Sequence, residues 1–186
     1  MGCRQFCVRP PEDGLVFLVD DDIVYPPDYC DGLTRAHEAL APTQTIVGVH
    51  GVIYPEYWDG AVQSRLVMTF NKALEKSMFV NQLGTGTVAF HSSLYPHLEE
   101  MASAARFVDV RFAKLAYERG VPMVCIRRPA GWLKQIDVQE SVYTTFTAKS
   151  DPVVLQEVLS FGGVSKLPVD QSALRAADEA MSAIGT

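Results

Sequence analysis

The chain has 186 residues, of which 48% are apolar or aromatic and 20% are charged, a composition typical of an ordinary globular protein. A chain of this length can bury roughly 70% of its unfolded surface, so a hydrophobic core can form without disulfides or a structural metal. The formal net charge is -6 and no basic block runs along the chain, which argues against broad nucleic-acid binding through phosphate contacts. No stretch approaches the roughly 20 apolar residues that span a bilayer, and the start has no apolar signal-peptide segment, so we expect a cytoplasmic protein without a transmembrane segment.

The first predicted element is a strand at residues 15–19, LVFLV, which is apolar at every position, as in a strand covered on both faces. It ends at three consecutive carboxylates, after which a helix is predicted over residues 28–40. Residues 45–49 predict a second strand, and residues 50–54 continue it if the chain only kinks at Gly51. Residues 54–76 fit strand and helix patterns equally well.

The second half of the chain predicts further short strands and three helices. Strands at residues 78–80 and 87–90 flank a glycine loop, and residues 94–105 are helical or irregular. The most regular helical spacing starts at Asp109 and ends at Gly120, and a buried type of strand follows at residues 121–126. The tail predicts a helix opened by Asp151 and Pro152 and a second one capped by Asp170.

The acidic turn after the first strand is the strongest candidate for chemistry. It consists of Asp20, Asp21 and Asp22, and like charges this close raise one another's pKa unless a cation lies between them. Carboxylate oxygens suit Mg²⁺ or Mn²⁺, and open α/β sheets place ligands at the carboxyl ends of strands. The alternative is a solvated acidic turn that caps the following helix.

Five segments, in this order, resemble the second half of family 2 glycosyltransferases with the GT-A fold, especially those linked to bacterial surface polysaccharides. The segments are FLVDDDIVYPPDY, VGVHGVIY, NQLGTGTVAFH, FVDVRFAKLAYERGVPMVCI and GWLK. The resemblance implies an α/β fold with a mixed, mainly parallel sheet flanked by helices. It makes residues 1–135 a partial GT-A domain and residues 136–186 a C-terminal helical extension that packs on the domain or on a partner.

The resemblance also implies roles for the acids. The acidic turn resembles the DxD-type element that holds Mn²⁺ or Mg²⁺ against the diphosphate of a nucleotide sugar. The register favours Asp21 as the carboxylate that contacts the metal, with Asp20 and Asp22 beside it. Asp109 resembles the catalytic base that takes the proton of the acceptor hydroxyl. The alternative for Asp109 is the N-cap of the helix that starts there.

For several other residues the resemblance implies a role in substrate binding, while the residue type alone is equally consistent with a structural role. Gly84, Thr85 and Gly86 let the backbone approach a sugar, or form a tight turn. Trp132 stacks on an acceptor sugar, or belongs to the core. Lys134, together with Arg127 and Arg128, neutralises the departing diphosphate, or lies in a solvated basic turn. Three histidines, His50, His91 and His97, lack metal-ligand spacing, so core or surface roles are expected for them.

The chain departs from the family at its start. In a complete GT-A domain, strands and helices that bind the nucleotide precede the strand with the acids, whereas few residues precede it here. We therefore expect the N-terminal, nucleotide-binding half to be missing. An apolar strand with an open edge pairs with other chains. The expected partners are a separately encoded first half or a second copy in a homodimer, besides the nucleotide sugar and the glycan acceptor.

The function that follows is a metal-dependent inverting glycosyltransferase module of the hexosyltransferase type. It would transfer a sugar from a nucleotide-sugar donor to a glycan acceptor in surface polysaccharide synthesis. The alternative is a catalytically inactive remnant or partner-binding module of the same fold. A phosphatase of the haloacid dehalogenase type is disfavoured, because Ile23 and Val24 stand where the glycine and threonine of its DxDGT pattern belong.

Overall fold

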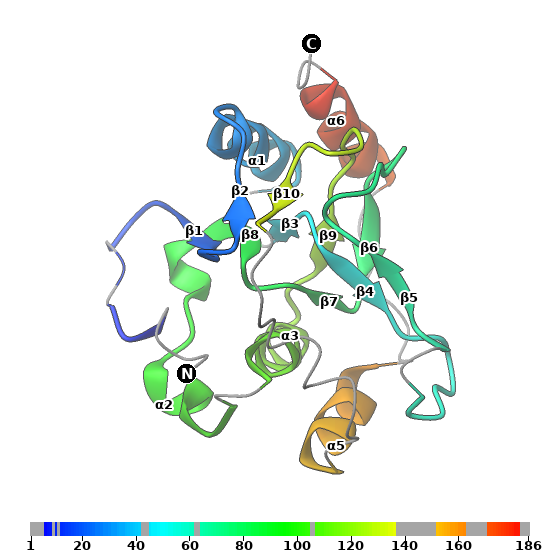
Figure 1. Cartoon of the computed structure of the whole chain (residues 1–186). Coiled ribbons are helices and arrows are strands. Elements are labelled where there is room, and N and C mark those ends of the chain that lie inside the picture. The colour runs from blue at the N-terminus through cyan, green and yellow to red at the C-terminus, as the bar shows by residue number, and fades with distance from the viewer. Residues whose placement is uncertain are drawn as a thin grey trace.

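Six long segments and two short ones are described by the computed structural model of the chain. They are residues 6–8, 10, 12–41, 45–61, 64–104, 107–136, 152–162 and 171–182. Together they form an α/β arrangement in which helices flank a five-stranded mixed sheet, with two smaller sheets beside it (Figure 1). A mixed sheet flanked by helices is what the sequence predicts. The expected helix starts at Asp151 and Asp170 lie outside the described residues.

The five-stranded sheet has the strand order β1-β8-β3-β9-β6. Its strands are β1 (Leu15–Val19), β8 (Thr87–His91), β3 (Ile46–Gly48), β9 (Met123–Cys125) and β6 (Met78–Val80). Only β3 and β9 pair in parallel, while the other three pairings are antiparallel, so the predicted mainly parallel sheet is wrong. An apolar run marks a strand covered on both faces but says nothing of its direction, and β8 runs opposite to both of its neighbours.

The single strand predicted over residues 45–54 is two strands in two different sheets. The second strand, β4 (Gly51–Ile53), lies between β5 (Leu66–Met68) and β7 (Gln82–Leu83) in a three-stranded sheet. The chain changes sheet at His50 and Gly51. A Cβ atom on Gly51 would lie 2.9 Å from Cβ of Cys125 and from Cγ1 of Val80, so a side chain there would crowd the core. The third sheet pairs β2 (Ile23–Val24) with β10 (Lys134–Gln135).

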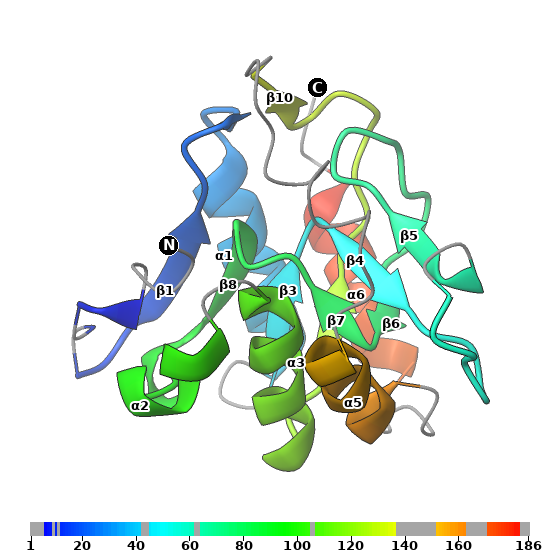
Figure 2. The ribbon, with the colours of Figure 1, turned by 60° about the horizontal axis from the view of Figure 1, so that its bottom comes forward.

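Helices cover both faces of the main sheet, as the two views show (Figures 1 and 2). On one face α1 (Tyr29–Ala39) and α6 (Gln171–Met181) enclose a core with Val47, Ala89 and Val124. On the other face lie α2 (Leu98–Met101), α3 (Val108–Glu118) and α5 (Pro152–Phe161). Their core includes Phe90 and Phe112. The short 3₁₀ helices η3 (Ser92–Leu94) and η4 (Ala102–Ala104) flank α2.

The two C-terminal helices contribute side chains to both cores. Val158 and Phe161 of α5 are buried against α3, and Leu174, Ala177 and Met181 of α6 are buried against α1. Polar contacts add to this packing on the α6 side, where the carboxylate of Asp178 accepts the backbone N–H of Ser77 at 2.7 Å. The helices α5 and α6 therefore pack on the same fold as the first half of the chain.

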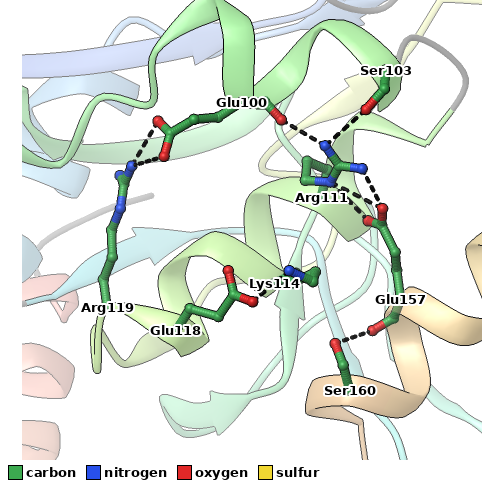
Figure 3. A network of polar contacts seen from close by, with 8 residues as sticks. All are labelled: Glu100, Ser103, Arg111, Lys114, Glu118, Arg119, Glu157 and Ser160. Atoms are coloured by element: carbon green, nitrogen blue, oxygen red, sulfur yellow. Dashed lines mark hydrogen bonds and ion pairs between the residues drawn. The ribbon is translucent and has the colours of Figure 1, made fainter.

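Arg111 ties three helices together (Figure 3). Its Nε donates to Oε2 of Glu157 in α5 at 2.9 Å, and its Nη1 donates to the backbone carbonyl of Glu100 at 2.6 Å. The same Nη1 donates to Oγ of Ser103 at 3.0 Å. Because both charged side chains are mostly buried, this ion pair fixes the position of α5 against α3 and α2.

No helix in the described ranges is long and apolar enough to cross a bilayer.

Candidate functional site

The acidic turn lies where β1 separates from β8. Continuing the β1–β8 register by one residue would place Asp20 opposite Gly86. The hydroxyl of Tyr25 takes the place of a direct backbone bond there. It accepts the N–H of Asp20 at 2.8 Å and donates to the carbonyl of Gly86 at 2.6 Å. Tyr25 therefore holds the acidic turn against the glycine loop, a role that the sequence motif did not suggest.

The carboxyl group of Asp20 lies directly on the glycine loop. A Cβ atom built on Gly86 would be 1.9 Å from Oδ2 of Asp20, so any side chain at position 86 would displace that carboxylate. The loop is the tight turn between β7 and β8, in which Thr87 N donates to the carbonyl of Gly84 at 2.9 Å. Gly86 therefore belongs to a tight turn, which was the alternative to a backbone that contacts a sugar. Because Gly86 has no side chain, the carboxylate of Asp20 fits against it.

The same loop holds Asp109, which lies in the first turn of α3. Both the backbone N–H and the hydroxyl of Thr85 donate to Oδ1 of Asp109, at 2.9 Å and 2.6 Å. The N-cap of α3 is Phe107, and it makes no side-chain capping bond. Asp109 is therefore not the N-cap, and its carboxylate faces the loop rather than the backbone of its own helix.

Asp20 and Asp109 share one electrostatic environment. The pKa of Asp20 is raised to about 6, most of all by burial, then by the negative charge of Asp109, and then by those of Asp22 and Asp21. The two carboxylates thus lie on the same side of the molecule, joined through Thr85 and Gly86. A shared site requires that the acidic turn and Asp109 lie close together, and this arrangement meets that requirement.

The donor set fits a hard divalent cation that a substrate helps to bind. Among the described residues, no group of three or more His, Cys, Asp and Glu side chains is arranged to hold a metal ion alone. Mg²⁺, however, is commonly bound through one or two carboxylates together with substrate phosphates and water. Asp20 has a raised pKa beside further carboxylates, and a cation would relieve that repulsion.

His50 is a polar neighbour of the site, although its sequence context predicted only a core or surface role. A Cβ atom on Gly84 would lie 3.3 Å from Cβ of His50, so the imidazole packs over the loop next to Thr85. Burial lowers the pKa of His50, while Asp109 raises it and Arg128 and Arg65 lower it, so the imidazole lies within the field of the proposed base. The proximity of His50 to the loop arises from the change of sheet between β3 and β4, which no local pattern signals.

Lys134 lies near the acidic turn through the pairing of β10 with β2. Lys134 pairs with Val24, and the backbone N–H of Ile136 donates to the carbonyl of Asp22 at 2.7 Å. The lysine is exposed. An exposed cation on the strand beside the acids could contact a bound phosphate.

Trp132 has the core position that was the alternative to sugar stacking. It is 7% exposed, and its Nε1 donates to Oδ1 of Asp28 at 3.0 Å. Its ring packs on Tyr29 with centroids 5.7 Å apart. This indole fixes the start of α1 and has no open face for an acceptor sugar.

Arg127 and Arg128 serve the fold. Arg128 is only 3% exposed, so it is not part of a solvated turn, and its Nη atoms donate to backbone carbonyls of Ile126 and Thr69 at 3.0 and 2.8 Å. Arg127 donates to Oγ of Ser182 at 2.9 Å, which links it to the end of α6. The guanidinium of Arg128 is therefore closed to a diphosphate, whereas Arg127 is partly exposed and Lys134 is exposed.

No protein-family model matches this chain, and a search among curated proteins found no significant match.

Proposed function

We propose that this chain is the module of a metal-dependent inverting glycosyltransferase that carries the metal-binding acids and the catalytic base. The observation that supports the proposal most directly is the convergence of two acids on one loop. Thr85 binds Oδ1 of Asp109, while Gly86 next to it admits the carboxylate of Asp20. The truncated GT-A fold and the resemblance that suggested it belong to this proposal.

Asp109 acts as the general base. Both of its hydrogen bonds from described residues end on Oδ1, which leaves Oδ2 for the hydroxyl of an acceptor sugar. Oδ2 takes the hydroxyl proton as the acceptor oxygen attacks the anomeric carbon of the donor sugar and the nucleoside diphosphate leaves from the opposite side. Asp109 lies in the first turn of α3, where the helix dipole interacts favourably with a negative charge.

Asp20, Asp21 and Asp22 hold the cation, and the negative charge of Asp109 acts on Asp20. Mn²⁺ or Mg²⁺, when bound, neutralises charge that develops on the diphosphate leaving group. Lys134 on β10 adds a positive charge at the same end of the sheet. The sequence register favours Asp21 as the metal-contacting carboxylate, whereas the fit against Gly86 favours Asp20.

The substrates we propose are a nucleotide sugar and a glycan acceptor, with a hexosyl group transferred in the cytoplasm during surface polysaccharide synthesis. These assignments rest on the resemblance. The alternative, an inactive remnant or a partner-binding module of the same fold, has the same structure but does not bind a nucleoside diphosphate.

Calorimetry with uridine and guanosine diphosphates, with and without Mn²⁺, tests the proposal. We expect binding that requires Mn²⁺ and is lost in Asp20→Asn and weakened in Asp21→Asn. The matched control is Glu56→Gln, which removes one exposed carboxylate in the loop after β4. Absence of binding by the unaltered chain supports the inactive alternative, and binding that does not depend on Mn²⁺ or on Asp20 contradicts the metal assignment.

A further inference from the structure

The strand β1 forms one edge of the main sheet. Among the described residues, β1 pairs with β8 alone, and it lies at the left margin of the sheet in Figure 2. Both faces of β1 are covered, since Leu15 and Phe17 pack with the α1 side and Val16 with the α3 side. What remains open is therefore the backbone edge of the strand.

The register shows which backbone groups face that edge. Ser92 N donates to the carbonyl of Gly14 at 2.8 Å, so in the alternating antiparallel pattern Val16 and Leu18 also face β8. The residues between them face away. A second hydrogen bond supports this pattern. Val49 N donates to the carbonyl of Thr87, so Thr87 turns its backbone groups toward β3 and away from Val19, which stands opposite it in β1. The N–H and C=O groups of Leu15, Phe17 and Val19 thus form a row that points away from β8 and meets no hydrogen-bond partner among the described residues.

Within the described part of the chain, this edge has none of the features that usually prevent strand pairing. Proteins protect edge strands with lysines, prolines, bulges or a covering segment. The five residues of β1 are all apolar and unbulged in their pairing with β8. Leu15, Val16 and Phe17 remain half-buried, and Val19 is 53% exposed, so a further strand would bury more apolar surface.

The charges at the ends of β1 indicate what kind of strand fits. Glu12 and Asp13 precede the strand, and Asp20, Asp21 and Asp22 follow it. A second copy paired antiparallel around Phe17 would place Asp13 opposite Asp21 of the other copy. A parallel copy in register would place every acid beside its own equivalent. Like charges facing each other across a strand pair are destabilising, so a second copy is disfavoured.

We propose that β1 binds an extended segment of a different polypeptide that is apolar in its middle and carries a basic residue at each end. The backbone row of Leu15, Phe17 and Val19 supplies the hydrogen bonds, and the flanking acids select the charge of the partner. This inference concerns the sheet edge and does not depend on the glycosyltransferase proposal.

The probe is the peptide acetyl-Lys-Val-Thr-Val-Thr-Val-Lys-amide, titrated into the isotopically labelled full chain and followed by amide NMR. We expect shifts and slowed hydrogen exchange at Leu15, Phe17 and Val19. A peptide with glutamate in place of both lysines should bind about tenfold more weakly at about 0.05 M salt, and the difference should shrink at about 0.5 M. Equal binding of the two peptides, or no change at these amides, overturns the proposal.

Val19→Pro is the variant that separates edge binding from folding. Its N–H faces outward and its side chain is largely exposed, so proline removes one edge donor without removing a bond to β8. Val19→Thr is the matched control. We expect Val19→Pro to lose the peptide and Val19→Thr to retain it, with similar thermal unfolding. Sedimentation of the full chain should give a monomer at about 0.05 M salt, and a dimer that Val19→Pro abolishes would overturn the choice of partner.

Discussion

The fold makes the negative charge of Asp20 unfavourable. Its pKa is raised from 3.8 to about 6, so the folded state holds the proton more tightly than the unfolded state does. The resulting contribution to stability is fully present below about pH 4 and is lost as the pH rises to about 6, above which it stays lost. Below about pH 6 the proton on Asp20 therefore competes with a metal ion for the same carboxylate.

Asp20→Asn should stabilise the metal-free protein at about pH 7.5 by about 1 kcal/mol, a value discounted for solvent screening of a partly exposed group. The gain should vanish at about pH 3.5, where aspartic acid and asparagine are both neutral. Urea unfolding at the two pH values measures the difference, with Glu56→Gln as the control for loss of one negative charge. A gain that is equal at both pH values would show that the raised pKa is not its cause.

Gly86 is the residue on which the position of the Asp20 carboxylate depends. Gly86→Ala places a methyl group 1.9 Å from the present position of Oδ2, and the carboxylate, as the end of a flexible side chain, must move. We expect Mn²⁺-dependent binding of a nucleoside diphosphate to fall at least about tenfold, a loss of about 1.4 kcal/mol, with little change in unfolding.

Gly84→Ala is the matched control in the same loop, since the nearest atoms to its Cβ atom would belong to the side chain of His50, at 3.3 Å. It should weaken nucleotide binding less than Gly86→Ala. An equal effect of the two alanines would mean that the loop backbone, and not the position of Asp20, determines binding.

At the scale of elements, a mostly buried ion pair between Glu157 and Arg111 attaches α5 to α3. Glu157→Ala leaves the mostly buried guanidinium of Arg111 without its carboxylate, and it should cost about 2 to 3 kcal/mol. Hydrogen exchange should accelerate in α5 more than in α1. Glu118→Gln is the control, because the Lys114–Glu118 pair is more exposed and its loss should cost no more than about 0.5 kcal/mol. Similar costs for both changes would contradict the role of Arg111 as the clamp.

Local sequence patterns predicted β1 and the end of α3 but did not predict β5. The apolar run at residues 15–19 predicted the bounds of β1, and Gly120, with φ of 68°, ends α3 as predicted. The ambiguous stretch at residues 54–76 contains β5, whose three residues pair with β4 alone among the described strands. So short a strand carries too few residues to show a period, and its partner strand determines its conformation.

At the scale of the whole molecule, the C-terminal helices are part of both cores. A chain that ends after residue 136 lacks α5 and α6, which bury Val158, Phe161, Leu174, Ala177 and Met181. We expect such a chain to lose cooperative unfolding and to expose apolar surface, detectable by calorimetry and dye binding. A chain that ends after residue 182 retains both helices and is the control. Cooperative unfolding of the shorter chain would make the C-terminal helices a separate unit.

The sequence by itself determined the charge balance, the strand that ends in three acids, the glycine loop and the helix that begins near Asp109, because each depends on neighbours in the chain. Only the tertiary structure decided that β8 runs antiparallel between β1 and β3, that Tyr25 joins the acidic turn to Gly86, and that Thr85 binds Asp109. The same structure assigned Trp132 and Arg128 to the interior. These contacts join residues from about 24 to 104 positions apart, and a local pattern carries no information on which distant segments will pair.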